Sequence, residues 1–234
     1  MCGRIALFSP PRAMASLFDA ALGDGVDPEG RPSWNIGPTR RLDGIRHLEG
    51  SRVLERYRWG LIPSWAKDMS IATKTFNARA ETVAEKPSFR SAYKHRRLLV
   101  PIDGFYEWDR SVAPKPQPHY FSRADGTPLV LAGLYETWND PTTPDAPPLS
   151  SATILTTSAG DDMDEIHHRM PVVLEQETFD LWLSDDETEL DAVASLLQPA
   201  PQGTLVHHAV DRAVGNVRND GPELLDPAPR ETLL

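Results

Sequence analysis

The sequence of 234 residues has a single cysteine, Cys2, and no long apolar run. One cysteine excludes an internal disulfide and a zinc site built on several thiolates. No stretch approaches the roughly 18 to 20 uninterrupted apolar residues of a membrane-spanning helix. The N-terminus also lacks the basic segment and apolar run of a secretion signal. We therefore expect a protein that makes no membrane contact and works in a reducing, cytoplasmic setting.

Sequence features of common cofactor sites are also missing. The chain has no glycine-rich phosphate-binding loop. Its seven histidines include the adjacent pairs His167–His168 and His207–His208, but none has the carboxylate–histidine spacing of a metal-ligand set. We expect neither a bound cofactor nor a metal ion.

Positive charge is scarce overall, with a formal net charge of −10, but it is concentrated in the first hundred residues. Residues 1–100 hold 17 Lys and Arg against 10 Asp and Glu, whereas residues 101–234 hold 7 against 24. A local basic patch attracts a polyanion even when the whole chain is acidic. The asymmetry favours nucleic acid as a partner, although a well-solvated acidic surface in the second half also explains it.

Many short strand-like segments and few helices make up the pattern, with no repeat and no break in composition. Strands are predicted at residues 3–8, 52–62, 98–102, 105–108, 120–123, 129–134, 152–156 and 205–210. Helices are predicted at residues 88–93, 178–183 and 187–197, and from Ser9, as the N-cap before two prolines, to Gly23. The dipeptide Asp125–Gly126 predicts a β-hairpin. We expect one α+β domain over residues 1–226, with a curved, largely antiparallel, barrel-like sheet, a few peripheral helices and a flexible tail at residues 227–234.

The position of Cys2 gives it unusual chemistry. Methionine aminopeptidase removes Met1 when the second residue is small, and Cys2 then carries a free α-amine beside its thiol. Their reference pKa values are about 8 and 8.5, so both groups are partly deprotonated near neutral pH. The amine condenses with an aldehyde to an imine, and the thiol closes a thiazolidine ring on the imine carbon. The alternative is that Cys2 is a small buried apolar residue, as most lone cysteines are.

The start of the chain, Met1-Cys2-Gly3-Arg4, resembles that of the SOS-response-associated peptidase (SRAP) family of abasic-site-processing proteins. Six further blocks, in the family's order, are similar to its motifs: Trp34-Asn35-Ile36-Gly37-Pro38-Thr39, Trp59-Gly60-Leu61-Ile62-Pro63-Ser64-Trp65, Asn77-Ala78-Arg79-Ala80-Glu81-Thr82, Asp103-Gly104-Phe105-Tyr106-Glu107-Trp108, His167-His168-Arg169-Met170-Pro171 and Val214-Gly215-Asn216-Val217. Together these blocks are far more specific than a lone Met-Cys-Gly.

The resemblance implies that Cys2 captures abasic sites in single-stranded DNA as a covalent crosslink, which shields the lesion during repair of DNA damage. It implies that Glu107 is an acid/base and that Asn77 and His167 are its active-site companions. A partly buried carboxylate can carry the protons that imine formation requires. Histidine suits protonation of the sugar ring oxygen, and an asparagine amide can hold the amine or a sugar hydroxyl.

The same resemblance suggests a DNA-binding set. Arg4, Arg79 and Arg169 lie inside the matching blocks and suit phosphate contacts. Pro38 and Trp65 are candidates to wedge between bases or stack on them. Ala66 stands where many members have a second aromatic residue, which argues against a stacking platform of two aromatic rings. The alternative role for Trp65 is packing in the core. A further basic run comprises Lys86, Arg90, Lys94, Arg96 and Arg97, and a solvated surface explains it equally well.

Other interpretations stay open. Glu107 is equally compatible with an outward-facing strand position, His168 competes with His167, and Asn77 also suits a turn cap. An N-terminal-nucleophile amidotransferase also begins Cys-Gly, but the chain has no Asn-Gly dipeptide for its oxyanion element. A peptidase, including self-removal of Met1, is compatible with crosslinking, and a non-covalent reader of single-stranded DNA is the remaining alternative. We expect a monomeric enzyme whose partner is single-stranded DNA with abasic sites.

Overall fold

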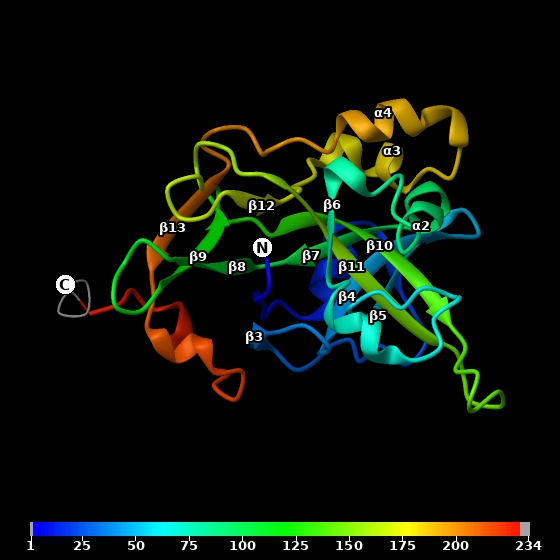
Figure 1. Ribbon diagram of the computed structural model, residues 1–234, viewed down its shortest axis with the longest axis horizontal. Helices are drawn as coiled ribbons and strands as arrows, with labels where there is room; N and C mark the ends of the chain where they lie inside the picture. Colours follow the sequence, from blue (N-terminus) through cyan, green and yellow to red (C-terminus); the bar gives the residue numbers. More distant parts are fainter. Residues whose placement is uncertain (1, 230–234) are drawn as a thin grey trace.

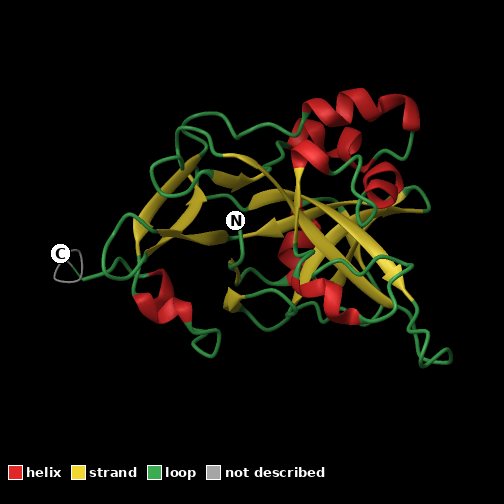
Figure 2. Ribbon diagram, viewed as in Figure 1, coloured by secondary structure: helices red, strands yellow, loops and turns green. Residues whose placement is uncertain are grey.

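The computed structural model describes residues 2–229 and contains two β-sheets with short helices at their margins (Figures 1 and 2). The smaller sheet has the strand order β13 (Leu205–Ala209), β9 (Gln117–Arg123), β8 (Gly104–Asp109), β1 (Ile5–Leu7) and β3 (Ser33–Ile36). All its pairings are antiparallel. The N-terminal strand therefore lies inside this sheet, between β8 and β3.

The larger sheet closes into a ring. Its order is β12 (Arg169–Pro171), β11 (Leu149–Ser158), β10 (Leu129–Trp138), β7 (Arg97–Ile102), β4 (Arg41–Leu48), β5 (Ser51–Trp59) and β2 (Ala20–Leu22), and β6 (Asn77–Arg79) pairs with β11. Strand β11 also pairs in parallel with β5, with Ala152 opposite Trp59, and this pairing closes strands β11, β10, β7, β4 and β5 into the ring. Buried apolar side chains of both sheets form the main core, and they include Ile5, Leu54, Leu99, Phe105 and Ile154.

The described residues include four short α-helices: α1 (Pro11–Leu17), α2 (Arg90–His95), α3 (Phe179–Leu183) and α4 (Leu190–Ser195). Helices α2, α3 and α4 gather at one end of the molecule (Figure 1). Turns of 3-10 helix are η1 (Met69–Thr73), η2 (Ala80–Thr82), η3 (Gln176–Thr178), η4 (Glu187–Glu189), η5 (Arg212–Gly215) and η6 (Pro222–Leu225). The predicted α+β class with a mostly antiparallel, barrel-like sheet is confirmed. Between residues 2 and 229 no helix has the length and apolar character to cross a membrane.

The predicted helix from Ser9 to Gly23 is wrong over its second half. Helix α1 ends at Leu17, and β2 follows in parallel pairing with β5. Ser9 is not the N-cap: Pro10 holds that position, and the Ser9 hydroxyl donates to Asp103 Oδ1 at 2.6 Å. Residues Ala20–Leu22, whose apolar spacing predicted a helix, instead pair as a strand with the edge of β5.

The predicted hairpin at Asp125–Gly126 is also wrong in its pairing. The turn forms, with Gly126 at φ 79° and the Thr127 N–H donating to Asp125. Its flanking strands, however, separate: β9 joins the smaller sheet and β10 the larger one. After the predicted domain end, the Ala228 N–H still donates to the Ala209 carbonyl at 2.8 Å. The rest of the predicted tail, residues 230–234, lies outside the described residues.

Candidate active site

Cys2 is fully buried where the N-terminal segment enters the smaller sheet. Pairing of β1 with β8 continues beyond the regular ladder, because the Tyr106 N–H donates to the Arg4 carbonyl at 2.9 Å. The segment from Cys2 to Arg4 therefore runs beside the part of β8 that carries Glu107. Burial, followed by the negative charge of Glu107, raises the pKa of the Cys2 thiol well above its usual range. The thiol is therefore held in its protonated form near neutral pH.

Asn77 comes from β6, which pairs in parallel with β11. Its side-chain Nδ2 donates to the Cys2 carbonyl at 2.7 Å. Its Oδ1 is buried and has no hydrogen-bond partner among residues 2–229. An unsatisfied buried carbonyl is costly and commonly marks a functional position. The amide thus fixes the backbone of Cys2 and leaves an acceptor beside it.

Glu107 lies on β8, and 4% of its surface is exposed. This burial excludes the outward-facing position that alternation alone left open. The charge of Glu107 contributes to raising the pKa of the Cys2 thiol and, against the larger effect of burial, raises the pKa of His167. The carboxyl group of Glu107 therefore lies close enough to Cys2 and His167 for its charge to act on both.

His167 stands just before β12 and is half-buried, whereas the adjacent His168 is exposed and stacks on it. His167 Nδ1 lies 3.0 Å from both the N–H and the carbonyl oxygen of Arg169, so the backbone of Arg169 can pair with either neutral tautomer of the ring. Burial lowers the pKa of His167, although Glu107 opposes that shift. Near neutral pH the imidazole is therefore mostly uncharged.

Two of the predicted DNA-binding arginines make contacts within the fold. Arg4 Nη1 donates to Asn35 Oδ1 and to the Val214 carbonyl, both at 2.6 Å. Arg169 is 9% exposed, forms a two-pronged ion pair with Glu81, and donates to the Thr156 carbonyl at 2.6 Å. In both arginines the Nε group is buried and has no partner among the described residues. Each guanidinium therefore supports the fold and keeps one uncommitted donor.

The other three predicted DNA contacts lie at or near the surface. Trp65 is 60% exposed, which excludes core packing, while Ala66 beneath it is buried. Arg79 is exposed at the end of β6, and Pro38 is half-buried in the turn before Thr39, which has φ 74°. No hydrogen bond within the described part of the chain joins these three side chains to Cys2, Asn77, Glu107 or His167. Of the three, Arg79 shares strand β6 with Asn77.

Three of the five residues of the predicted basic run are bonded within the fold, whereas no side-chain hydrogen bond or ion pair among residues 2–229 engages Lys86 or Arg90. Lys94 pairs with Glu187 at 3.2 Å, Arg96 pairs with Glu136 at 2.9 Å, and Arg97 is buried and donates to the Trp182 carbonyl. Asn35 is a residue whose role the sequence did not indicate. Its buried Nδ2 donates to three carbonyls of the later chain, at Val214, Asn216 and Asn219. Only its place inside a family-like block marked it.

Comparisons with known proteins agree over almost the whole chain. The model of the family described as "SOS response associated peptidase (SRAP)" matches residues 1–217. "Abasic site processing protein YoqW" of Bacillus subtilis is 40% identical over 97% of this chain and 99% of its own length. "Abasic site processing protein HMCES" of Gallus gallus is 33% identical over 97% of this chain and 78% of its own. A crystal structure of a Bacteroides thetaiotaomicron protein superposes with a TM-score of 0.84, at 26% identity, over 97% of this chain and all of that one.

Proposed function

The chain belongs to the SOS response associated peptidase (SRAP) family, and from that premise we propose that it processes abasic sites in DNA. In detail, we propose that mature Cys2 captures the aldehyde of an abasic site in single-stranded DNA as a thiazolidine. Its relatives YoqW and HMCES carry the name abasic site processing protein. The observation that carries the finer proposal is the enclosure of Cys2, held by Asn77 at 2.7 Å and within the field of the buried Glu107.

The proposed reaction begins at the amine. Removal of Met1, by an aminopeptidase or by the chain itself, frees the α-amine of Cys2. This nitrogen attacks the aldehyde carbon, and loss of one water leaves a carbon–nitrogen double bond. The thiol sulfur then bonds to the same carbon while its proton passes to the nitrogen. Because the raised thiol pKa disfavours a thiolate at the start, the order of amine first and thiol second is supported.

Three neighbours serve these steps in the proposal. Glu107 removes a proton from the attacking nitrogen and returns one to the departing hydroxyl. As the closed sugar opens to the aldehyde, its anomeric hydroxyl loses a proton and its ring oxygen gains one; His167, neutral at the start, takes up the first proton and delivers one to the ring oxygen. The unpartnered Asn77 Oδ1 accepts a hydrogen bond from the Cys2 amine. The three groups come from separate parts of the chain: Glu107 from β8, Asn77 from β6 and His167 from the residues just before β12.

DNA binding in the proposal uses the exposed residues around this group. Trp65, more than half exposed, stacks on a base, and Pro38 wedges against the neighbouring one. Arg79 contacts phosphate through a guanidinium that no described residue engages. Arg4 and Arg169 belong to the proposed set as well, but their guanidinium groups are bonded within the fold and their Nε atoms are buried. Their substitution should therefore affect stability as well as binding.

The test uses single-stranded DNA with one abasic site. Wild type and Cys2→Ala are incubated with it and run on a denaturing gel. We expect a shifted band for wild type and none for Cys2→Ala. A wild type without the band contradicts crosslinking. A band that persists in Cys2→Ala indicates a lysine imine instead, with strand cleavage as its product.

Met1 provides an internal control, because the proposal needs the free amine. A variant that keeps a residue before Cys2, such as an added N-terminal alanine on the mature chain, retains the thiol and the DNA-binding surface. We expect it to bind the same DNA and to form no heat-stable adduct. Equal crosslinking by this variant would show that the amine takes no part.

A further inference from the structure

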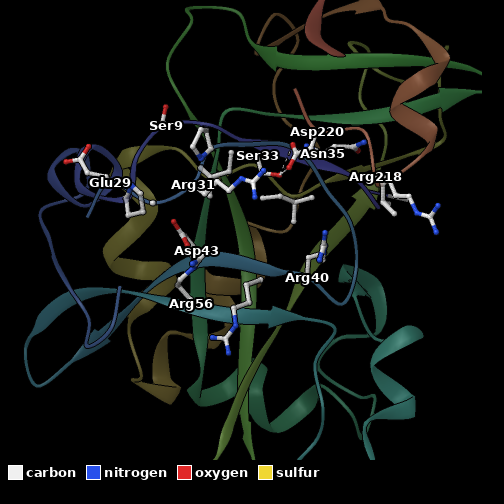
Figure 3. A pocket seen from close by; sticks show the side chains of 17 residues that line it. Ser9, Glu29, Arg31, Ser33, Asn35, Arg40, Asp43, Arg56, Arg218 and Asp220 are labelled. Carbon is white, nitrogen blue, oxygen red and sulfur yellow. Dashed lines mark hydrogen bonds and ion pairs between the residues drawn. The ribbon is translucent and has the colours of Figure 1, made fainter. Parts of the chain in front are cut away.

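A basic groove runs between the edge strand β3 and the β4–β5 hairpin, with a volume of about 630 Å³. Figure 3 shows Arg31 on the β3 side and Arg40 on the β4 side, with Arg218 near one end. The groove takes residues from four parts of the chain: the segments 7–11 and 29–43, strand β5 and the stretch 217–220. It is a separate feature from the enclosure of Cys2.

The acidic side chains of this groove are already neutralised or bonded. Glu29 pairs with Arg12 at 2.8 Å. Asp43 is buried and faces Arg56 at 3.4 Å. Asp220 accepts hydrogen bonds from the Ser33 hydroxyl and from the Trp34 N–H. Arginines thus compensate the charges of Glu29 and Asp43, whereas Asp220 keeps its charge and has hydrogen bonds to β3.

The remaining arginines are uncommitted. Within the described part of the chain, no hydrogen bond or ion pair engages the guanidinium groups of Arg31, Arg40, Arg41 and Arg218. This differs from Lys94, Arg96 and Arg97 around α2, whose charged groups are all bonded within the fold. Uncompensated positive charge in a groove is an electrostatic site for phosphate, and free guanidinium groups match its oxygens in forked geometry.

One end of the groove lies toward the N-terminal end of β1, which Cys2 precedes. Antiparallel pairing puts Ile36 opposite Ile5 and Ser33 opposite Leu7, so the chain after Ile36 runs toward the Cys2 end of β1. Pro38 and Arg40 therefore lie at the near end of the groove, and Arg31 and Ser33 lie at the far end. A DNA strand held at Cys2 and leaving past Pro38 would enter this groove.

We propose that the groove binds the phosphate backbone of the single DNA strand on one side of the lesion, through Arg31, Arg40, Arg41 and Arg218. This inference rests on the proposed function, since it takes the DNA to be anchored at Cys2. The contacts are to phosphates, so they carry no base preference. They extend the bound length of DNA and make binding more sensitive to salt.

The experiment measures binding, without crosslinking, to oligonucleotides that carry a tetrahydrofuran analogue of the abasic site, which has no aldehyde. Three oligonucleotides extend from the lesion on its 5′ side, on its 3′ side or on both. The groove variant is Arg31→Gln/Arg218→Gln. The control is Arg110→Gln/Lys115→Gln, which removes the same charge from the exposed turn between β8 and β9.

We expect the groove variant to lose roughly tenfold in affinity for the oligonucleotides that carry one particular flank. Its salt slope should fall by about 0.7 for each arginine on a single strand. The oligonucleotide with only the opposite flank should bind the groove variant, the control and wild type alike. Equal losses in variant and control, or a loss that ignores the flank, would overturn the proposal.

Two further measurements complete the experiment. One distinguishes a DNA strand from a small phosphate ligand, and the other distinguishes failure of the groove proposal from failure of the thiazolidine proposal. Calorimetry with inorganic phosphate and with dAMP tests a small-molecule site, and binding of these that needs Arg31 and Arg218 without any flank effect would overturn the strand assignment. Crosslinking to true abasic DNA is scored in parallel. If wild type shows flank-dependent binding but forms no adduct, the thiazolidine proposal is contradicted and the groove proposal is supported. If it forms the adduct normally but shows no flank dependence, the groove proposal is contradicted and the thiazolidine proposal is supported.

Discussion

At the scale of single residues, burial decides which groups around Cys2 can react. The thiol is held protonated by burial and by Glu107, and His167 is held neutral mainly by burial. From the sequence, Cys2, Asn77, Glu107 and His167 could be predicted as a group because each sits in a family-like block. The unpartnered Asn77 Oδ1 could not, since it depends on β6 pairing with β11 beside the N-terminus.

The first prediction concerns Glu107. Glu107→Gln keeps the shape of the side chain and removes its proton transfer, so we expect crosslinking to slow by roughly 10²-fold or more. Binding to the tetrahydrofuran analogue should change little. The measurement is the single-turnover rate of adduct formation, with Glu85→Gln, an exposed carboxylate, as control. Equal rates for wild type and Glu107→Gln would remove Glu107 from the mechanism.

The second prediction concerns His119, which lies opposite Glu107 across β8 and β9. Its Nδ1 is 3.0 Å from His207 Nδ1, so the pair can share one proton but cannot readily hold two. Burial, reinforced by His207, lowers the pKa of His119 to about 4. The unfolded chain, with a histidine pKa of about 6.5, binds the proton more readily. This contribution to stability is therefore present above pH 6.5 and is lost as the pH falls toward 4.

We expect the unfolding free energy to fall by roughly 1–2 kcal/mol through this histidine pair as the pH is lowered from 7 to 4, after allowance for the partial exposure of the pair. Urea unfolding as a function of pH measures it. His119→Phe should flatten that part of the profile, whereas His47→Gln, an exposed histidine on β4, should not. An unchanged profile in His119→Phe would refute the assignment.

At the scale of elements, the sequence predicted where strands lie better than it predicted which strands pair with each other. The strands on either side of Asp103–Gly104 were predicted, and they form as β7 and β8. Strand β4 was not among the predicted strands, and it contains Asp43–Gly44, a dipeptide typical of turns. In the fold Asp43 is buried against Arg56, and a Cβ on Gly44 would lie 2.6 Å from Leu98. Long-range packing, invisible in a local window, makes both residues suitable for a strand.

Closure of the larger sheet depends on Gly60, immediately after β5. Its φ is 125°, its N–H donates to the Ala152 carbonyl at 2.8 Å, and a Cβ would lie 2.5 Å from the Ala72 carbonyl oxygen. Both the backbone angle and the contact forbid a side chain. We predict that Gly60→Ala lowers the unfolding free energy by roughly 2–4 kcal/mol.

Thermal or urea unfolding of Gly60→Ala measures this cost. The matched control is Gly215→Ala, where no atom approaches an added Cβ within 4 Å, and we expect a change within about 0.5 kcal/mol. Similar effects of the two substitutions would contradict the assigned role of Gly60 in closing the ring.

At the scale of the whole molecule, the basic surface depends both on where basic residues lie in the sequence and on which of them the fold bonds. The sequence showed that basic residues concentrate in the first hundred positions. It could not show which of them the fold neutralises. The fold bonds the charged groups of Lys94, Arg96 and Arg97 around α2 and leaves Arg31 and Arg40 open in a groove beside the edge strand β3. A protein with a net charge of −10 thus presents a local surface suited to DNA.

The central claim is that one residue, Cys2, supplies both atoms that hold the lesion. Its most direct test is mass spectrometry of the N-terminal peptide after reaction with abasic single-stranded DNA and nuclease digestion. We predict a peptide that begins at Cys2 and carries the sugar remnant with loss of one water, resistant to thiol alkylation and to borohydride reduction. An adduct on a lysine, an alkylatable Cys2 within the adduct, or a peptide that still begins at Met1 would contradict the claim.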